Sequence, residues 1–148
     1  MAYAESTVGG SLGGQFRVWV NSIRTRQGDA ADNSEDWRVE GGIKRVTAGS
    51  RVWNNYNQAS YTVQLGMNGV ASSGNFSYDF ASGYTGPQHA WGTGATRVNR
   101  NSAGVGFGFQ SRMDINLSNS PYLTSGWVTS NDSVATIYRH ASLTALSM

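Results

Sequence analysis

A long alternation of apolar and polar residues near the centre of the sequence constrains the fold most. From Val105 to Leu117 every second residue is apolar or Ser, and the residues between them are Gly or polar. Neighbouring side chains of a β-strand point to opposite faces, so this period of two predicts a long, half-buried strand in a central position. Phe107 is expected on the buried face, where truncation to Ala would cost about 3–5 kcal/mol. Gly104, Gly106 and Gly108 leave the other face bare, so another backbone or a ring can approach it closely.

Shorter alternations, separated by Gly, Ser, Thr and Asn, fill the rest of the chain, which is typical of all-β proteins. The stretch 91–117 is expected to form two strands and a turn. Further strands are expected at 15–23, 36–46, 51–56, 61–67, 76–80, 122–129 and 134–146, with a bulge at Gly41-Gly42 and turns at 54–58, 68–69 and 131–132. Together these predict an antiparallel β-sandwich of about eight or nine strands.

A single domain accounts for 148 residues. Residues 1–14 are Gly-rich and irregular, which predicts a flexible N-terminal arm ahead of a sandwich domain over 15–148. Tyr3, Val8 and Leu12 give the arm apolar anchors for a neighbouring subunit. Because a sandwich also has exposed edges, a homo-oligomer is expected.

The composition narrows the compartment and the partners. The chain has no Cys, which excludes a disulfide framework and a thiol nucleophile. The net charge of +2 is too small to indicate nucleic-acid binding. With no signal-peptide pattern and no apolar run that spans a bilayer, we expect synthesis in the cytoplasm and no membrane insertion.

Neither a catalytic set nor a metal site is predicted. The only two histidines, His89 and His140, lack ligand spacing, and no Ser lies in a G-x-S-x-G turn. Five acids between Asp29 and Glu40 suggest a calcium loop, but their spacing and the neighbouring arginines favour a solvated loop. Asp79 and Asp114 are expected to meet Arg or solvent. We therefore expect no enzyme activity and no cofactor.

Surplus aromatic rings provide the remaining candidates for a functional surface. They are Trp19, Trp53, Tyr84, Trp91 and Trp127. Buried Trp and Tyr are common at subunit contacts, and exposed rings stack on sugars in carbohydrate-binding modules. The sequence leaves both interpretations open.

Four short pieces of the sequence resemble the immunoglobulin-like sandwich modules of minor tail and other virion structural proteins of long-tailed bacteriophages. They are Asn33-Ser34 with Trp37, the apolar strand ending at Met67-Asn68-Gly69, Trp91-Gly92-Thr93 with Arg97-Val98-Asn99 and the strand 105–109, and the ending Ile137-Tyr138-Arg139-His140-Ala141-Ser142. The family's ending reads Ile-Pro-Arg-Ala-Ser, so the proline is absent here. The likeness covers about residues 15–144.

The resemblance implies a non-enzymatic structural subunit of a virion, most simply a tail-associated (minor tail) protein. Its partners would be other virion structural proteins. Two other placements remain open at this stage: a capsid decoration protein, or a carbohydrate-binding module that recognises a host surface glycan. A small hydrolase is the third class to be tested.

Overall fold

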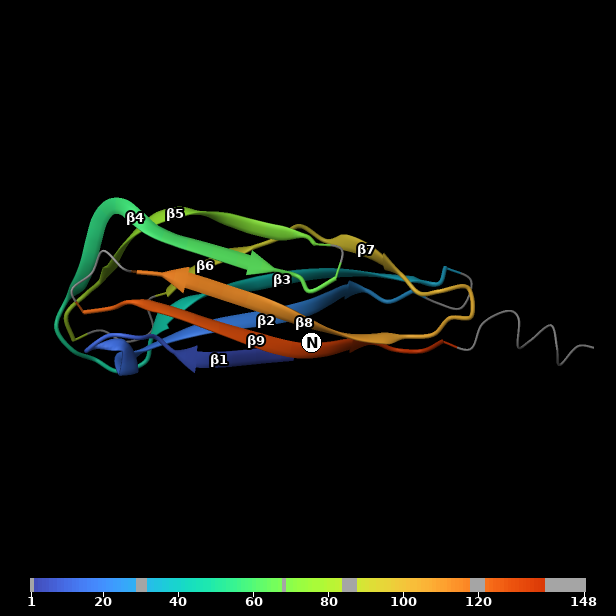
Figure 1. Ribbon diagram of the computed structural model, residues 1–148, viewed down its shortest axis with the longest axis horizontal. Coiled ribbons are helices and arrows are strands. Elements are labelled where there is room, and N and C mark those ends of the chain that lie inside the picture. The colour runs from blue at the N-terminus through green and yellow to red at the C-terminus, as the bar shows by residue number, and fades with distance from the viewer. Residues whose placement is uncertain (1, 29–31, 68, 84–87, 118–121, 138–148) are drawn as a thin grey trace, which may run out of the picture.

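The computed structural model describes residues 2–28, 32–67, 69–83, 88–117 and 122–137. Two antiparallel sheets pack face to face as an elongated β-sandwich, with nine strands and one short 3-10 helix among the described residues (Figure 1). The predicted fold class is confirmed.

The first sheet contains β1 (Ala2–Thr7), β2 (Phe16–Arg26), β3 (Ser34–Arg45), β6 (Gln88–Gly92) and β7 (Thr96–Asn99). Its strand order is β1-β2-β3-β6, and β7 pairs with the beginning of β3. The second sheet has the order β5-β4-β8-β9, formed by β4 (Val52–Gln64), β5 (Ala71–Phe80), β8 (Phe107–Asn116) and β9 (Ser125–Val134). The 3-10 helix η1 covers Gly13–Gln15.

The core lies between the sheets and follows the predicted alternation in several strands. Phe16, Val18 and Val20 of β2 are fully buried, as are Trp37 and Val39 of β3. Each set lies at every second position, because only one face of each sheet is turned to the other sheet. These faces were predicted correctly.

The central strand has the predicted position but a shorter buried face. β8 lies between β4 and β9, and Phe109, Met113 and Ile115 are buried. Phe107 is 38% exposed, so the prediction that it fills the core was wrong. Phe107 is the first residue of β8 and pairs with Val134, the last residue of β9, so it lies at the end of the sheet.

The two limbs of the stretch 91–117 do not pair with each other, contrary to the prediction. β6 and β7 pair with β3 in the first sheet, whereas β8 pairs with β4 and β9 in the second. The chain therefore crosses between the sheets through 100–106. The predicted close approach to the glycines is seen at Gly106, where an added Cβ would lie 1.9 Å from the carbonyl oxygen of Val134.

Two other local predictions were wrong in β3 and β4. The register of β3 with β2 runs through Gly41 and Gly42 without the predicted bulge. A side chain at Gly42 would collide with β6, because an added Cβ would lie 2.0 Å from the carbonyl oxygen of His89. The predicted strands 51–56 and 61–67 are one strand, β4, whose register shifts between Asn54 and Ala59. Asn57 takes up the irregularity with φ of 55°.

The N-terminal arm and the last strands also differ from the predictions. Residues 2–7 form β1, which pairs with β2 along its whole length, so this part of the arm is not loose. Asn131 and Asp132 lie within β9 and not in a turn. Ala135–Ile137 contain no strand, and the rest of the predicted strand 134–146 lies outside the described residues.

The hairpin predicted at 68–69 is present between β4 and β5. Gly69 has φ of 63°, a conformation that Gly adopts without strain, and the amide of Leu65 donates to the carbonyl of Val70 at 2.9 Å. Asn68 itself lies outside the described residues.

Candidate functional site

The predicted interface residues fall into three groups. Tyr3, Trp53 and Trp127 are about half exposed. Val8 and Trp19 are buried, and Leu12 and Trp91 pack partly buried against the core. Tyr84 lies outside the described residues. Only the first group is available to a partner of the folded chain.

Val8 is buried in the core of its own domain, and Leu12 packs partly buried against that core. Gly9 donates to the carbonyl of Ser125 and accepts from the amide of Thr124, both at 2.9 Å, and Leu12 donates to the carbonyl of Tyr122. These hydrogen bonds join the end of β1 to the start of β9. The segment therefore closes one side of the sandwich and covers an edge that would otherwise be open.

Trp19 is covered by the same segment. The Tyr3 ring stacks on Trp19 at 6.0 Å, and Lys44 donates to the Tyr3 hydroxyl and pairs with Glu5 at 2.9 Å. Burial is the largest effect on Tyr3 and raises its pKa, while the hydrogen bond from Lys44 lowers the pKa of Glu5. Trp19 is therefore buried within the chain, and its ring is not exposed as a contact patch.

The opposite side of the sandwich is closed by rings. Trp91 of β6 stacks on Tyr61 of β4 with centroids 4.0 Å apart, and Phe76 and His89 extend the cluster. Burial lowers the pKa of His89 below its usual value. Because aromatic rings surround the imidazole, His89 is positioned as a packing residue and not as a general base.

The described acids of the predicted solvated loop are paired with arginines, and Asp29 lies outside the described residues. Arg26 binds both Asp32 and Asp36, and Arg38 pairs with Glu40 at 3.2 Å. The pKa of Asp32 is lowered chiefly by a hydrogen bond that the Ser34 hydroxyl donates to it, and then by Arg26. The pKa of Asp36 is lowered chiefly by its hydrogen bond from Arg26. Among the described residues no group of three or more His, Cys, Asp or Glu could hold a metal ion.

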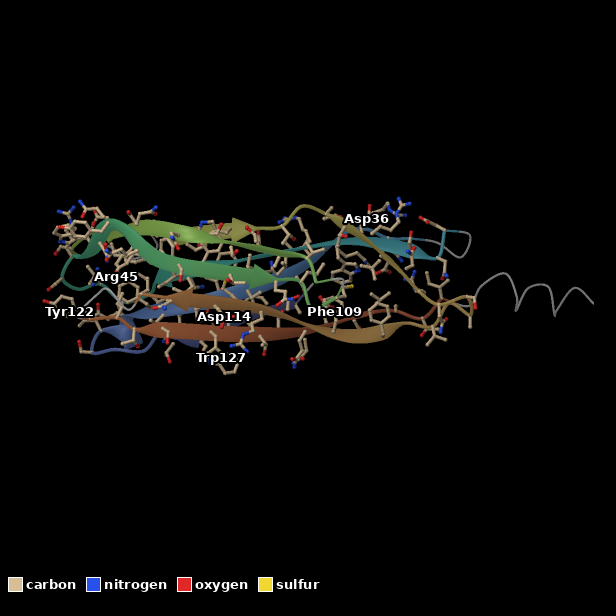
Figure 2. All side chains as sticks on the ribbon, turned by 45° about the horizontal axis from the view of Figure 1, so that its top comes forward. Asp36, Arg45, Phe109, Asp114, Tyr122 and Trp127 are labelled. Atoms are coloured by element: carbon tan, nitrogen blue, oxygen red, sulfur yellow. The ribbon has the colours of Figure 1, made fainter. Side chains whose placement is uncertain are left out.

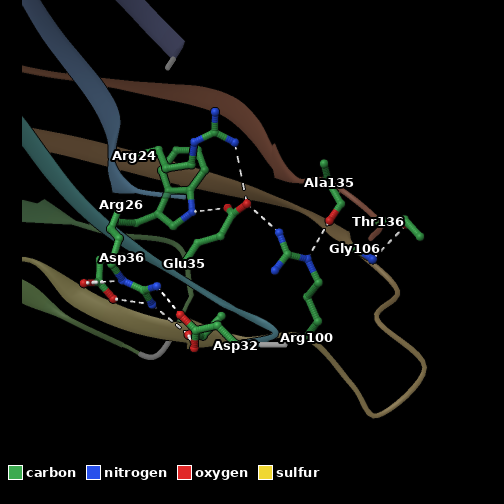
Figure 3. A network of polar contacts seen from close by, with 11 residues as sticks. Arg24, Arg26, Asp32, Glu35, Asp36, Arg100, Gly106, Ala135 and Thr136 are labelled. Atoms are coloured by element: carbon green, nitrogen blue, oxygen red, sulfur yellow. Dashed lines mark hydrogen bonds and ion pairs between the residues drawn. The ribbon is translucent and has the colours of Figure 1, made fainter. Parts of the chain in front are cut away.

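Glu35 is the exception, because it is buried. Its carboxylate accepts from the Trp37 indole at 2.9 Å and from Arg100 Nη2 at 2.5 Å, and Arg24 lies 3.5 Å away (Figure 3). Arg100 Nε also donates to the carbonyl of Ala135 at 2.6 Å. The network joins β3 to the segment before β8, through Arg100, and to the segment after β9, through Ala135.

Sequence reasoning missed this network, although a signal was present. Glu35 shares the buried face of a strand with Trp37 and Val39. A carboxylate in that position requires a buried cation or several donors. The sequence did not indicate which of the ten arginines would supply it.

Asp79 and Asp114 meet arginines, as predicted. Arg51 binds Asp79 through two nitrogens at 2.7 and 2.9 Å, and this hydrogen bonding lowers the pKa of Asp79. Arg112 binds Asp114 in the same bidentate way, at 2.7 and 2.9 Å. Each acid is held by its own partner, and they lie at different places on the second sheet.

Among the described residues, two surfaces are candidate places for a partner. The first is one end of the sandwich, which we call the apolar end; it is formed by Val46, Trp53, Tyr56 and Tyr122. Tyr56 is 74% exposed and Trp53 52%. They lie where β4 begins, beside the loops at the same end (Figures 1 and 2).

The second surface is the outer face of the second sheet around Trp127, which is 55% exposed. Arg112 lies over the indole, 4.4 Å from its centroid. Beside the ring is a hollow of about 200 Å³, lined by Ser60, Tyr61, Thr62, Asp114, Ile115, Asn116, Ser125, Gly126 and Trp127. This face offers one ring and several hydroxyl, amide and carboxylate groups.

Comparison with known proteins adds no family assignment: no family model, curated protein or solved structure matches the chain. None of the described helices is long and apolar enough to cross a membrane.

Proposed function

We propose that the chain is a non-enzymatic structural subunit of a bacteriophage virion, associated with the tail and acting through subunit contacts. The observation that carries the proposal is the apolar end of the sandwich. The resemblance to immunoglobulin-like modules of minor tail proteins supplies the virion context.

The apolar end has the composition of a protein contact. Val46, Trp53, Tyr56 and Tyr122 are four of the eight large hydrophobic side chains that are exposed among the described residues. Such a concentration marks an interaction site more often than scattered exposed residues do. Trp and Tyr are also the residues that contribute most binding energy at interfaces.

The exposed charges beside Trp53 are paired with each other. Arg51 lies over the Trp53 ring, 5.7 Å from its centroid, and binds Asp79. The surface therefore combines exposed rings with a polar rim whose charges are compensated, as in the rims of protein interfaces. A partner could cover the rings without desolvating an unpaired charge.

The opposite end supports contacts between several copies. Val105 and Phe107 are exposed there, at the far end of the long axis. Apolar groups at both ends allow end-to-end contacts with a second copy or with another virion protein, and such contacts close into rings when the rotation permits. A homo-oligomer is therefore part of the proposal.

The test is incorporation into particles. A phage whose own copy of the gene is deleted is complemented with wild-type chain, with the double variant Trp53→Ser and Tyr56→Ser, or with Trp127→Ser. Trp127 is as exposed as Trp53 but lies away from the apolar end, which makes it a matched control. Quantitative mass spectrometry of purified particles measures copies of each variant.

We expect at least tenfold fewer copies of the double variant, with wild-type levels of Trp127→Ser. Equal melting temperatures of the three chains show that the loss is not caused by unfolding. Absence of the wild-type chain from purified particles would overturn the proposal. Undiminished incorporation of the double variant would remove the apolar end as the contact.

A further inference from the structure

We propose that the outer face of the second sheet carries a binding site for a neutral saccharide, centred on Trp127. The site is distinct from the apolar end, and it goes beyond the structural function proposed above. Its ligand class follows from the side chains that surround the ring.

Trp127 is held in place as a stacking platform. The Arg112 guanidinium lies over the indole and is fixed by two hydrogen bonds to Asp114. Asp114 is the cross-strand neighbour of Trp127, so the three side chains form one cluster (Figure 2). An exposed ring that is already ordered loses little conformational entropy when a ligand stacks on it.

The free side of the ring adjoins the polar hollow. Arg112 pairs with Thr129, on one side of Trp127 along β9. Asn116 pairs with Ser125 on the other side of Trp127, and both residues border the hollow. Arg112 therefore covers one side of the indole and leaves the other side to form a wall of the hollow. A sugar ring placed there would set its C–H face against the indole.

The floor of the hollow supplies partners for sugar hydroxyls. Thr62 and Ser60 of β4, and Asp114 and Asn116 of β8, lie in neighbouring cross-strand pairs on this face. Hydroxyl and amide groups both donate and accept, and the Asp114 carboxylate has lone pairs beyond those used by Arg112. These are the groups that fix a polyhydroxylated ligand against a ring.

The size of the surface indicates a chain of sugars and not a deeply buried ligand. The hollow of about 200 Å³ is smaller than the usual small-molecule pocket. A second open hollow of about 460 Å³ lies against the same strand and is lined by Ser6, Thr7 and residues 125–129. Trp127 borders both, so a polysaccharide can continue across it.

Charge selects a neutral ligand. Arg112 and Asp114 cancel each other, and the residues lining the two hollows include no other charged side chain. A phosphate-rich or uronic-acid polymer would find no uncompensated cation there. Among the residues that line the two hollows, Trp127 is the only large hydrophobic side chain that is exposed, whereas the centre of a protein interface holds several.

The test uses the full chain labelled with 15N and follows the indole N–H resonances during titration. The probes are dextran, a galactan and a mannan as neutral polymers, and polygalacturonate as the anionic one. The variants are Trp127→Ala and Asp114→Asn, with Trp53→Ala as the matched control, because Trp53 is equally exposed and also has an arginine over its ring.

We expect at least one neutral polymer to shift the Trp127 resonance saturably. Trp127→Ala should weaken binding at least tenfold and Asp114→Asn several-fold, while Trp53→Ala stays within twofold of wild type. The proposal is overturned if no neutral polymer shifts Trp127, if only polygalacturonate does, or if Trp53→Ala weakens binding as much. Incorporation into particles is measured separately, so either proposal can fail alone.

Discussion

Neutralising Glu35 while its partner stays charged tests the structural account most sharply within the domain. Glu35→Gln keeps the shape of the side chain but leaves Arg100 buried without a counter-charge. The Glu35 and Arg100 side chains are 1% and 0% exposed, so water cannot replace the lost partner. Breaking a fully buried pair in this way costs about 3–5 kcal/mol of unfolding free energy.

The loss should depend on the presence of the arginine. Arg100→Met removes the cation and the hydrogen bond to Ala135, and leaves Glu35 with Trp37 and the more distant Arg24. In the double variant neither charge is buried, so its loss should be well below the sum of the two single losses. Urea unfolding of all four chains, followed by circular dichroism, gives the complete cycle.

Asp114→Asn serves as the control, because Arg112 and Asp114 are both nearly half exposed. Its unfolding midpoint should change little, as is usual for a surface pair. The reasoning is refuted if Glu35→Gln costs less than about 1 kcal/mol, or if the two single losses add within about 0.5 kcal/mol.

Four further expectations concern the core, pH and the edges of the domain. Phe109→Ala should cost about 3–5 kcal/mol by cavity formation, and the exposed Phe107→Ala much less; equal losses in urea unfolding would contradict the assignment of faces. Burial holds the pKa of His89 below its usual 6.5, so stability should be lost as pH falls below about 6.5, and His89→Phe should remove that dependence in thermal unfolding. Gly66→Ala should destabilise the fold strongly, because the added Cβ would lie 1.3 Å from the carbonyl oxygen of Gln110; an unchanged melting temperature would show that this contact is wrong. Deleting Ala2–Thr7 should lower the melting temperature by many degrees, whereas removal of a loose arm would leave it unchanged.

The sandwich and much of its core could be predicted because a strand records its buried face with a period of two. Trp37 with Val39, and Met113 with Ile115, show this directly. The hairpin at 68–69 could be predicted because Gly69 adopts the positive φ that such a turn requires. Such signals are local and need no knowledge of the neighbouring strand.

The remaining errors concern information that is not local. The alternation continues through Phe107, although this residue lies at the end of β8 and is 38% exposed. Nothing in the residues 91–99 shows that they pair with β3 and not with β8. Asn57 resembles a turn residue and has a positive φ, but it lies inside β4, in the stretch where the register with β5 shifts. Which strands pair depends on contacts between segments that are far apart in the sequence.

The candidate surfaces were predicted in part. Trp53 and Trp127 were named from composition and are exposed, whereas Trp19 and Val8 are covered by the chain itself. Exposure depends on what the N-terminal segment packs against, and its Gly-rich sequence did not indicate that residues 2–7 pair with β2 of the same chain. The pairing of Arg112 with Trp127 likewise requires the register of β8 and β9.

Locating the chain in purified particles tests the central claim most directly. Fab fragments raised against the folded chain are bound to purified virions and imaged by electron cryomicroscopy. The account predicts Fab density at a fixed position on the tail, repeated in several symmetry-related copies. Particles that contain the full set of structural proteins but neither bind the Fab nor yield peptides of this chain would contradict it.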